Sequence, residues 1–130
     1  MARSRIRPVL SEVQLEIMNI IWDKSPCSIA DIWNVLRERR GVSRNTAHTL
    51  VMRLKDKGWL IQESTSSGFR YRAAASREST QQRGVQKMIE TLFAGSAEGL
   101  VLTLLDGKTL SKTEAERIRR LIDNSKARKS

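Results

Sequence analysis

A run of polar residues beginning at Ser43 has the types and spacing needed to contact the edges of nucleic acid bases. Arg44 can make two hydrogen bonds to guanine and Asn45 two to adenine, whereas a threonine suits a phosphate or a thymine methyl group. The alternative to base contact is a polar face that only contacts water, which is the usual case for exposed helix faces. The predicted contact residues of this segment are Ser43, Arg44, Asn45, Thr46, His48, Thr49 and Arg53.

These residues need a helix that turns them outward, and the sequence predicts one from Ser43 to about Lys57. Ser43 can cap its start, Gly58 can end it, and its apolar residues recur at helical spacing. The predicted inward stripe consists of Ala47, Leu50, Val51 and Leu54, and Met52 is predicted to face outward with the polar residues.

Two helices are predicted before this one. The first covers residues 11–24, where Ser11 and Gln14 form a capping box. The second begins at Ser28 and ends at Gly41, which has the residue type for a left-handed stop. Only Gly41 and Val42 then separate it from the Ser43 helix, as in a helix-turn-helix.

A β-hairpin is predicted next, because the apolar period changes from about 3.6 to 2. Its strands are residues 59–63 and 69–73, joined by the turn-forming run 64–68. Arg70 and Arg72 share the face opposite Tyr71. They are predicted to contact phosphate or to enter a minor groove.

Net charge agrees with a polyanionic partner. The chain carries 24 Lys and Arg against 14 Asp and Glu, a formal charge of +10. Together with the helix-turn-helix and hairpin, this favours double-stranded DNA, while a module that docks protein or RNA is the alternative. Residues 3, 5 and 7 are arginines that suit either a groove-inserting arm or, more simply, a disordered basic terminus. No apolar run approaches the ~20 residues of a membrane span, so a cytoplasmic protein without a membrane partner is expected.

The sequence gives no support to an enzyme, a metal site or a cofactor. Cys27 is the single cysteine and His48 the single histidine, and neither has a Cys or His partner. Cys27 is predicted to pack as a small apolar group or lie near a turn surface rather than act as a redox switch. No catalytic residue is therefore assigned.

The remaining residues, 76–130, predict three helices and no strand, followed by a basic, disordered tail after Asn124. About fifty residues bury too little surface to be secure alone. A second copy of the chain, related by two-fold symmetry, is the simplest cover for their apolar stripes. The predicted dimerisation residues are Val85, Met88, Ile89, Leu92, Phe93, Leu100, Val101, Leu104, Leu105, Ile118 and Ile122.

The sequence also resembles the BlaI/MecI/CopY family of bacterial repressors. The resemblance rests on residues 10–12 leading into 18–22, on residues 43–54 followed by Lys57 and Gly58, and on 95–96, 99–102 and 110–111. It implies a mostly α fold with a small β-hairpin: a winged helix-turn-helix domain over residues 1–75 and a helical dimerisation domain over residues 76–130. It also implies a homodimer that binds inverted-repeat operators and represses transcription.

Two departures from the family pattern limit what the resemblance implies. Nothing after Cys27 can supply the Cys-rich motif of the copper-responsive members. Thr103 and Leu104 stand where the β-lactam-responsive members carry the Asn-Phe pair at which they are cleaved. Release by an inactivating protease, by another sensor partner or by a ligand therefore stays open.

Overall fold

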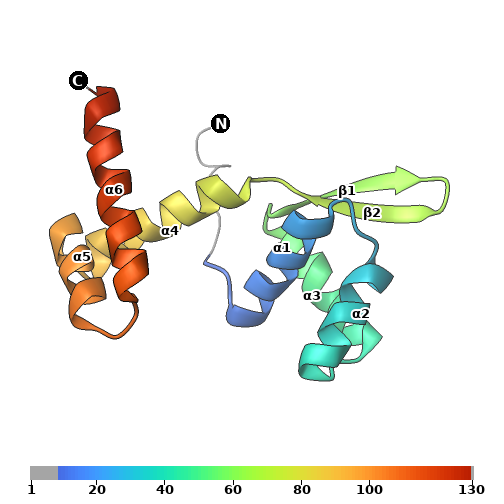
Figure 1. Ribbon diagram of the computed structural model, residues 1–130. Coiled ribbons are helices and arrows are strands. Elements are labelled where there is room, and N and C mark those ends of the chain that lie inside the picture. The colour runs from blue at the N-terminus through green and yellow to red at the C-terminus, as the bar shows by residue number, and fades with distance from the viewer. Residues whose placement is uncertain (1–8, 130) are drawn as a thin grey trace. The chain divides into compact units, whose positions relative to one another are not determined.

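The computed structural model describes residues 9–129, which form six helices and one two-stranded antiparallel hairpin (Figure 1). This agrees with the predicted mostly α fold with a small hairpin. The elements are α1 (Glu12–Lys24), α2 (Ile29–Arg40), α3 (Arg44–Asp56), β1 (Leu60–Thr65), β2 (Gly68–Ala73), α4 (Arg77–Thr91), α5 (Ala97–Asp106) and α6 (Lys112–Lys129).

The first two helices begin where their capping residues predict. The Ser11 hydroxyl accepts the Gln14 backbone N–H at 3.2 Å, and the Gln14 side chain accepts the Ser11 N–H at 3.0 Å. Ser28 and Asp31 form the same reciprocal pair at the start of α2. Because each box satisfies donors that a helix start leaves unpaired, both starts are fixed by residues within one turn.

The turn between α2 and α3 is as short as predicted. Gly41 has φ +67° and ψ 21°, a left-handed conformation that strains other residues, and its N–H donates to the Arg37 carbonyl at 2.9 Å. Ser43 then caps α3 by accepting the Thr46 N–H. The tight turn packs α2 and α3 against each other.

The hairpin extends closer to its turn than predicted, because its strands are 60–65 and 68–73. Its register pairs Leu60 with Ala73 and Thr65 with Gly68. The sequence did not indicate a further bridge, in which the backbones of Cys27 and Tyr71 exchange hydrogen bonds of 3.0 and 2.7 Å. This bridge attaches the segment before α2 to the free edge of β2.

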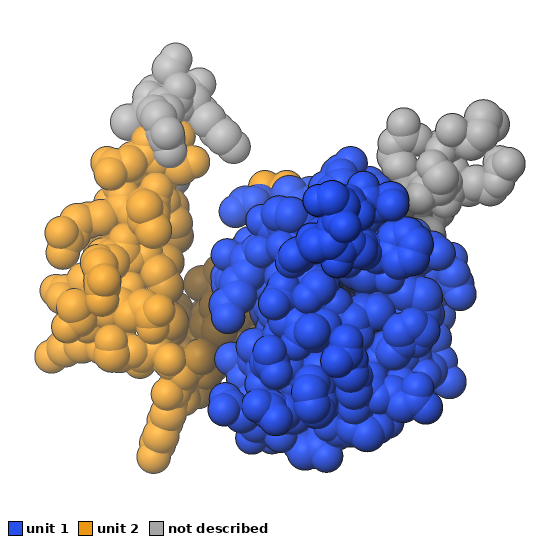
Figure 2. Space-filling view, turned by 90° about the vertical axis from the view of Figure 1, so that its right-hand side faces the viewer, with its two compact units in different colours: residues 1–81 blue, residues 82–130 orange. Residues whose placement is uncertain are grey.

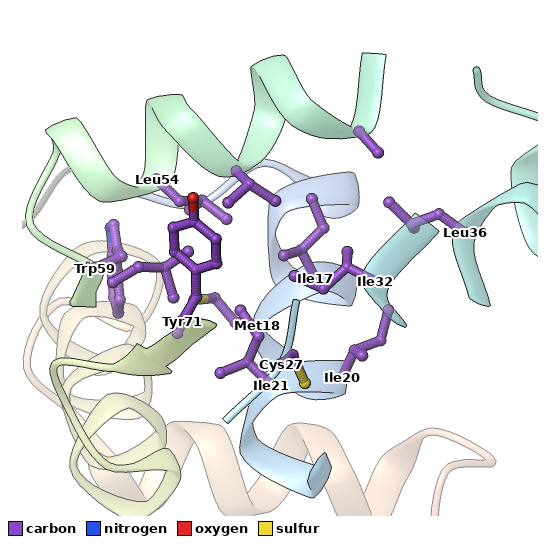
Figure 3. Close-up of a cluster of buried hydrophobic side chains, with 13 residues drawn as sticks. Ile17, Met18, Ile20, Ile21, Cys27, Ile32, Leu36, Leu54, Trp59 and Tyr71 are labelled. Carbon is purple, nitrogen blue, oxygen red and sulfur yellow. The ribbon is translucent and has the colours of Figure 1, made fainter. Parts of the chain in front are cut away.

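A hydrophobic core fills the space between α1, α2, α3 and the hairpin. Tyr71 projects from β2 between Leu54, Trp59 and Met18, and Cys27 lies near Ile20 and Ile21 (Figure 3). The Tyr71 side chain is 2 % exposed, and its hydroxyl donates to Gln62 Oε1 at 3.1 Å. This core holds the outer faces of α3 and the hairpin in place.

The chain divides into two compact units, residues 1–81 and 82–130 (Figure 2). The division falls six residues later than the predicted boundary after residue 75, because α4 begins in the first unit and continues into the second.

The end of the chain differs from the prediction of a disordered tail. Helix α6 continues to Lys129 instead of ending near Asn124. Residues 125–129 include no proline or glycine, so the sequence holds no residue type that would end the helix at Asn124. Within the part of the chain that the structure describes, no helix is long and apolar enough to cross a membrane.

Candidate nucleic-acid interface

Helix α3 has one buried face and one exposed polar face. Ala47, Val51 and Leu54 are fully buried and Leu50 is half-buried, as the predicted inward stripe requires. Met52, which the helical period placed on the outer face, is instead half-buried against the core. All seven predicted contact residues of this segment are exposed: Ser43, Arg44, Asn45, Thr46, His48, Thr49 and Arg53.

Hydrogen bonds within α3 limit what its hydroxyl groups can do. Ser43 Oγ accepts the Thr46 N–H at 3.1 Å and donates to Thr46 Oγ1 at 3.0 Å, so this hydroxyl is used by the cap. Thr49 Oγ1 donates to the Asn45 carbonyl at 3.1 Å. Because phosphate oxygens only accept, Thr49 in this state offers its methyl group rather than a donor. The arginine and the amide of the first turn therefore supply the main donors.

A hollow of about 320 Å³ lies at the start of α3, lined by Ile29, Arg44, Asn45 and His48. Sequence reasoning missed Ile29, which comes from the first turn of α2. The hollow combines an apolar wall with a guanidinium, an amide and an imidazole. Guanidinium and amide donors beside an apolar wall suit contact with the bases and sugars of a nucleic acid.

The two predicted hairpin cations are both paired with carboxylates. Arg70 Nη1 lies 3.3 Å from Asp31 Oδ2, and Arg72 Nε lies 2.6 Å from Glu63 Oε2. Each pair is partly exposed, so it contributes little stability, but it reduces the charge that the hairpin presents. Glu63 stands opposite Arg70 in the register of the hairpin, so its ion pair with Arg72 is the diagonal one across the two strands. Asp31, 39 residues away from Arg70, leaves no short-range signal in the sequence.

Asp31 connects the hairpin to the helices. Hydrogen bonds from Ser28, together with the nearby Arg70 guanidinium, lower the pKa of the Asp31 carboxyl below its ordinary value, so it is ionised at neutral pH. Ile29 and Asp31 both belong to the first turn of α2. This turn therefore contacts the α3 hollow on one side and the hairpin arginine on the other.

The single cysteine is part of the core. Cys27 is 1 % exposed, and its thiol donates to the Lys24 carbonyl at 3.4 Å. Burial raises the pKa of this thiol, which keeps it protonated. The prediction that it packs as a small apolar group is confirmed. His48 is exposed on α3, and among the described residues no group of three His, Cys, Asp or Glu is placed to hold a metal ion.

The second unit leaves its apolar residues uncovered. No described side chain between Gln82 and Ser125 is buried. Leu92 is 76 % exposed, and Val85, Met88, Val101, Leu105 and Ile122 are also exposed. The other predicted dimerisation residues, Ile89, Phe93, Leu100, Leu104 and Ile118, are half-buried. The basic residues 3, 5 and 7 lie outside the described residues, so the suggested groove-inserting arm is not described.

A short helix-turn-helix whose second helix exposes Arg and Asn, followed by a hairpin that carries Arg70 and Arg72, defines a winged-helix DNA-binding protein. The sequence model of the penicillinase repressor family matches residues 10–124. The chain therefore belongs to the penicillinase repressor family and is a DNA-binding transcriptional repressor. The hairpin is accordingly called the wing below.

Individual relatives support this assignment. The methicillin resistance regulatory protein MecI of Mammaliicoccus sciuri is 27 % identical over 114 residues, covering 88 % of this chain and 93 % of that protein. The penicillinase repressor of Bacillus licheniformis is 24 % identical and covers 94 % and 95 %. The solution structure of monomeric B. licheniformis BlaI with the blaP half-operator matches 56 % of this chain and 89 % of that chain, with 26 % identity and a TM-score of 0.51.

Proposed function

We propose that the protein acts as a homodimer that represses transcription by binding an inverted repeat, with one winged helix on each half-site. The observation that carries the proposal is the division of surface between the units. The first presents the polar outer face of α3 and the wing, and the second leaves Leu92 and its apolar neighbours uncovered. A two-fold dimer covers such a surface with an identical copy and presents two copies of α3 to DNA.

The half-operator complex of B. licheniformis BlaI supports this division of roles. That structure holds a monomeric form on half an operator, and its match covers only 56 % of this chain. A winged helix of this kind can therefore engage one half-site. Joining two of them raises the effective concentration of the second at its site, which strengthens binding without a new type of contact. We also propose that the protein works in the cytoplasm, as expected for a transcriptional repressor of this family.

Within each half-site we assign base reading to α3 and phosphate contact to the wing. Arg44 and Asn45 occupy the exposed first turn of α3, where bidentate contacts to bases in the major groove are expected. We assign Arg53, further along the same helix, and the wing residues Arg70 and Arg72 to the phosphate backbone. Ser43 contributes through the cap that fixes this turn. The half-sites are expected about one helical turn, or a multiple of it, apart.

Selection of duplex fragments by the full-length protein, followed by footprinting, tests the proposal. An inverted repeat protected on both halves is the expected result. Binding that is uniform along DNA and disappears with salt would contradict it, and would direct attention to protein or RNA partners.

Two substitutions then test the division between α3 and the wing. Arg44→Ala should lose about 5- to 150-fold on the selected sequence and little on random DNA, since one bidentate base contact contributes about 1–3 kcal/mol. Arg70→Ala should weaken both duplexes to a similar extent and reduce the salt dependence. Lys57→Ala, which removes an equal charge at the far end of α3, is the control. Identical behaviour of Arg44→Ala and Arg70→Ala on both duplexes would show that the assigned roles are wrong.

A further inference from the structure

The segment that leaves the winged helix is held by hydrogen bonds along its length. The Ala74 N–H donates to the Trp59 carbonyl at 2.9 Å, and the Trp22 indole N–H donates to the Ala75 carbonyl at 3.0 Å. Ser76 then accepts the Ser79 N–H at 3.0 Å, which caps α4. The junction after β2, where the sequence alone places the domain boundary, is therefore not a loose linker.

One arginine then holds the first turn of α4 against α1. Arg77 Nη2 lies 2.8 Å from Asp23 Oδ1, 3.2 Å from the Asn19 carbonyl oxygen and 3.3 Å from Asn19 Oδ1. Its guanidinium carbon also stands 5.5 Å from the centre of the Trp22 ring. A charge-assisted hydrogen bond and a cation–π contact act on the same planar group. We call these four residues, Arg77, Asp23, Asn19 and Trp22, the Arg77 clamp.

The character of α4 changes a few residues further on. Arg77, Ser79 and Thr80 are half-buried, whereas every residue from Gln81 to Met88 is exposed. The division between the two compact units falls after Gln81. Gly84 follows within the same helix, and nothing lies within 4 Å of the position that a Cβ would take there. No close contact with the described residues 9–129 explains this glycine, and glycine is the weakest helix former after proline.

We propose that the Arg77 clamp fixes the direction in which α4 leaves the winged helix, and thereby determines which half-site spacing the dimer accepts. In this scheme Gly84 provides the limited bending that remains. The inference rests on the proposed homodimer, because spacing has meaning only when two winged helices are joined through their second units. It makes Arg77 a positioning residue, which contacts no DNA base and acts through the path of α4.

The geometry of DNA allows a sensitive test of the role assigned to the Arg77 clamp. One added base pair moves a half-site by about 3.4 Å and rotates it by about 35° around the duplex axis. A dimer whose winged helices are clamped to α4 must strain the clamp, the helix or the DNA to follow that movement. A dimer without the clamp follows it at little cost.

The experiment measures binding of full-length protein to four duplexes: a selected inverted repeat, one half-site alone, and repeats with the centre lengthened by one or two base pairs. The wild type should lose about tenfold or more on the lengthened repeats, because the second half-site loses its effective concentration. Arg77→Ala should lose less than about threefold, with half-site affinity within about twofold of wild type. Asp23→Asn should relax the spacing in the same direction, and it keeps the test open if Arg77→Ala fails to fold.

Lys87→Ala is the matched control, because it removes one positive charge from α4 and leaves the Arg77 clamp intact. It should keep the wild-type spacing penalty, and an equal relaxation in this variant would attribute the effect to charge and overturn the inference. A folded, dimeric Arg77→Ala protein with the wild-type spacing penalty would also overturn it. If the wild type itself prefers no inverted repeat over a half-site, the proposed function fails instead, so the two failures are distinguishable.

Gly84→Ala tests the second half of the inference. Alanine favours the helix and has room for its methyl group, so α4 should bend less. The spacing penalty should therefore become steeper than in the wild type, while sedimentation shows an unchanged dimer. An unchanged penalty would remove Gly84 from its assigned role. Loss of the dimer would assign the glycine to a close approach between copies and would equally overturn that role.

Discussion

Replacing Leu92 by aspartate tests the dimer surface directly, since this side chain is 76 % exposed in the single chain. The folded monomer should tolerate the change, because Leu92 contributes little to its own unit. In a two-fold dimer each subunit contributes one Leu92, so the substitution removes two buried leucine side chains from the interface. Full burial of a leucine contributes about 1.5–3 kcal/mol, so two copies contribute about 3–6 kcal/mol. At about 1.4 kcal/mol per tenfold, the dimer dissociation constant should rise by roughly two to four orders of magnitude.

Sedimentation equilibrium measures this change, and the circular dichroism spectrum shows whether the helices remain. Operator affinity should fall toward that of a single half-site, while binding to an isolated half-site stays within about twofold. Thr91→Asp is the matched control, because it places the same charge on the neighbouring exposed residue of α4. A Leu92→Asp protein that dimerises within about threefold of wild type would refute the assignment of this surface, and Leu104→Asp provides a second test on α5.

Two further predictions concern the winged helix itself. Hydrogen bonding to Arg40 lowers the pKa of Glu16 below its ordinary 4.5, and hydrogen bonds from Ser28 lower that of Asp31 below 3.8. A carboxyl group whose pKa is lower in the folded than in the unfolded protein stabilises the fold at any pH above its pKa in the unfolded chain. The free energy of unfolding should therefore be constant from neutral pH to about 5 and fall as the pH drops below about 4.5. Urea unfolding against pH measures this, and Glu16→Gln should show a shallower fall; a loss of stability between pH 7 and 5 would contradict the assignment. Separately, Tyr71→Phe should lower the free energy of unfolding by about 0.5–1.5 kcal/mol, because it removes the bond to Gln62 and leaves the ring in place. Thermal unfolding measures it, and an unchanged midpoint would mean that this buried hydroxyl contributes nothing.

Local signals in the sequence are sufficient for the helices of the winged helix and for the outer face of α3. Ser11 with Gln14, Ser28 with Asp31, and Gly41 act within one helical turn of their own positions. The burial of Ala47, Val51 and Leu54 follows from the helical period alone. The same period places Arg44 and Asn45 on the opposite, exposed side of α3. The roles of these residues on DNA remain proposals. Met52 departs from the pattern because the core reaches further round α3 than the inward stripe indicates.

Contacts between distant segments required the tertiary structure. Arg70 meets Asp31 across 39 residues, and Arg77 meets Asp23 across 54. Neither pair leaves a periodic or short-range signal, because each forms only when the core has brought a strand or helix beside another element. The Cys27–Tyr71 bridge and the hollow beside Ile29 arise in the same way. The sequence by itself determined that a polar helix and a basic wing would form, since caps and periodicity act locally. Only the packed fold decided which of the wing's charges are neutralised and how α4 is attached, since those depend on which surfaces the core brings together.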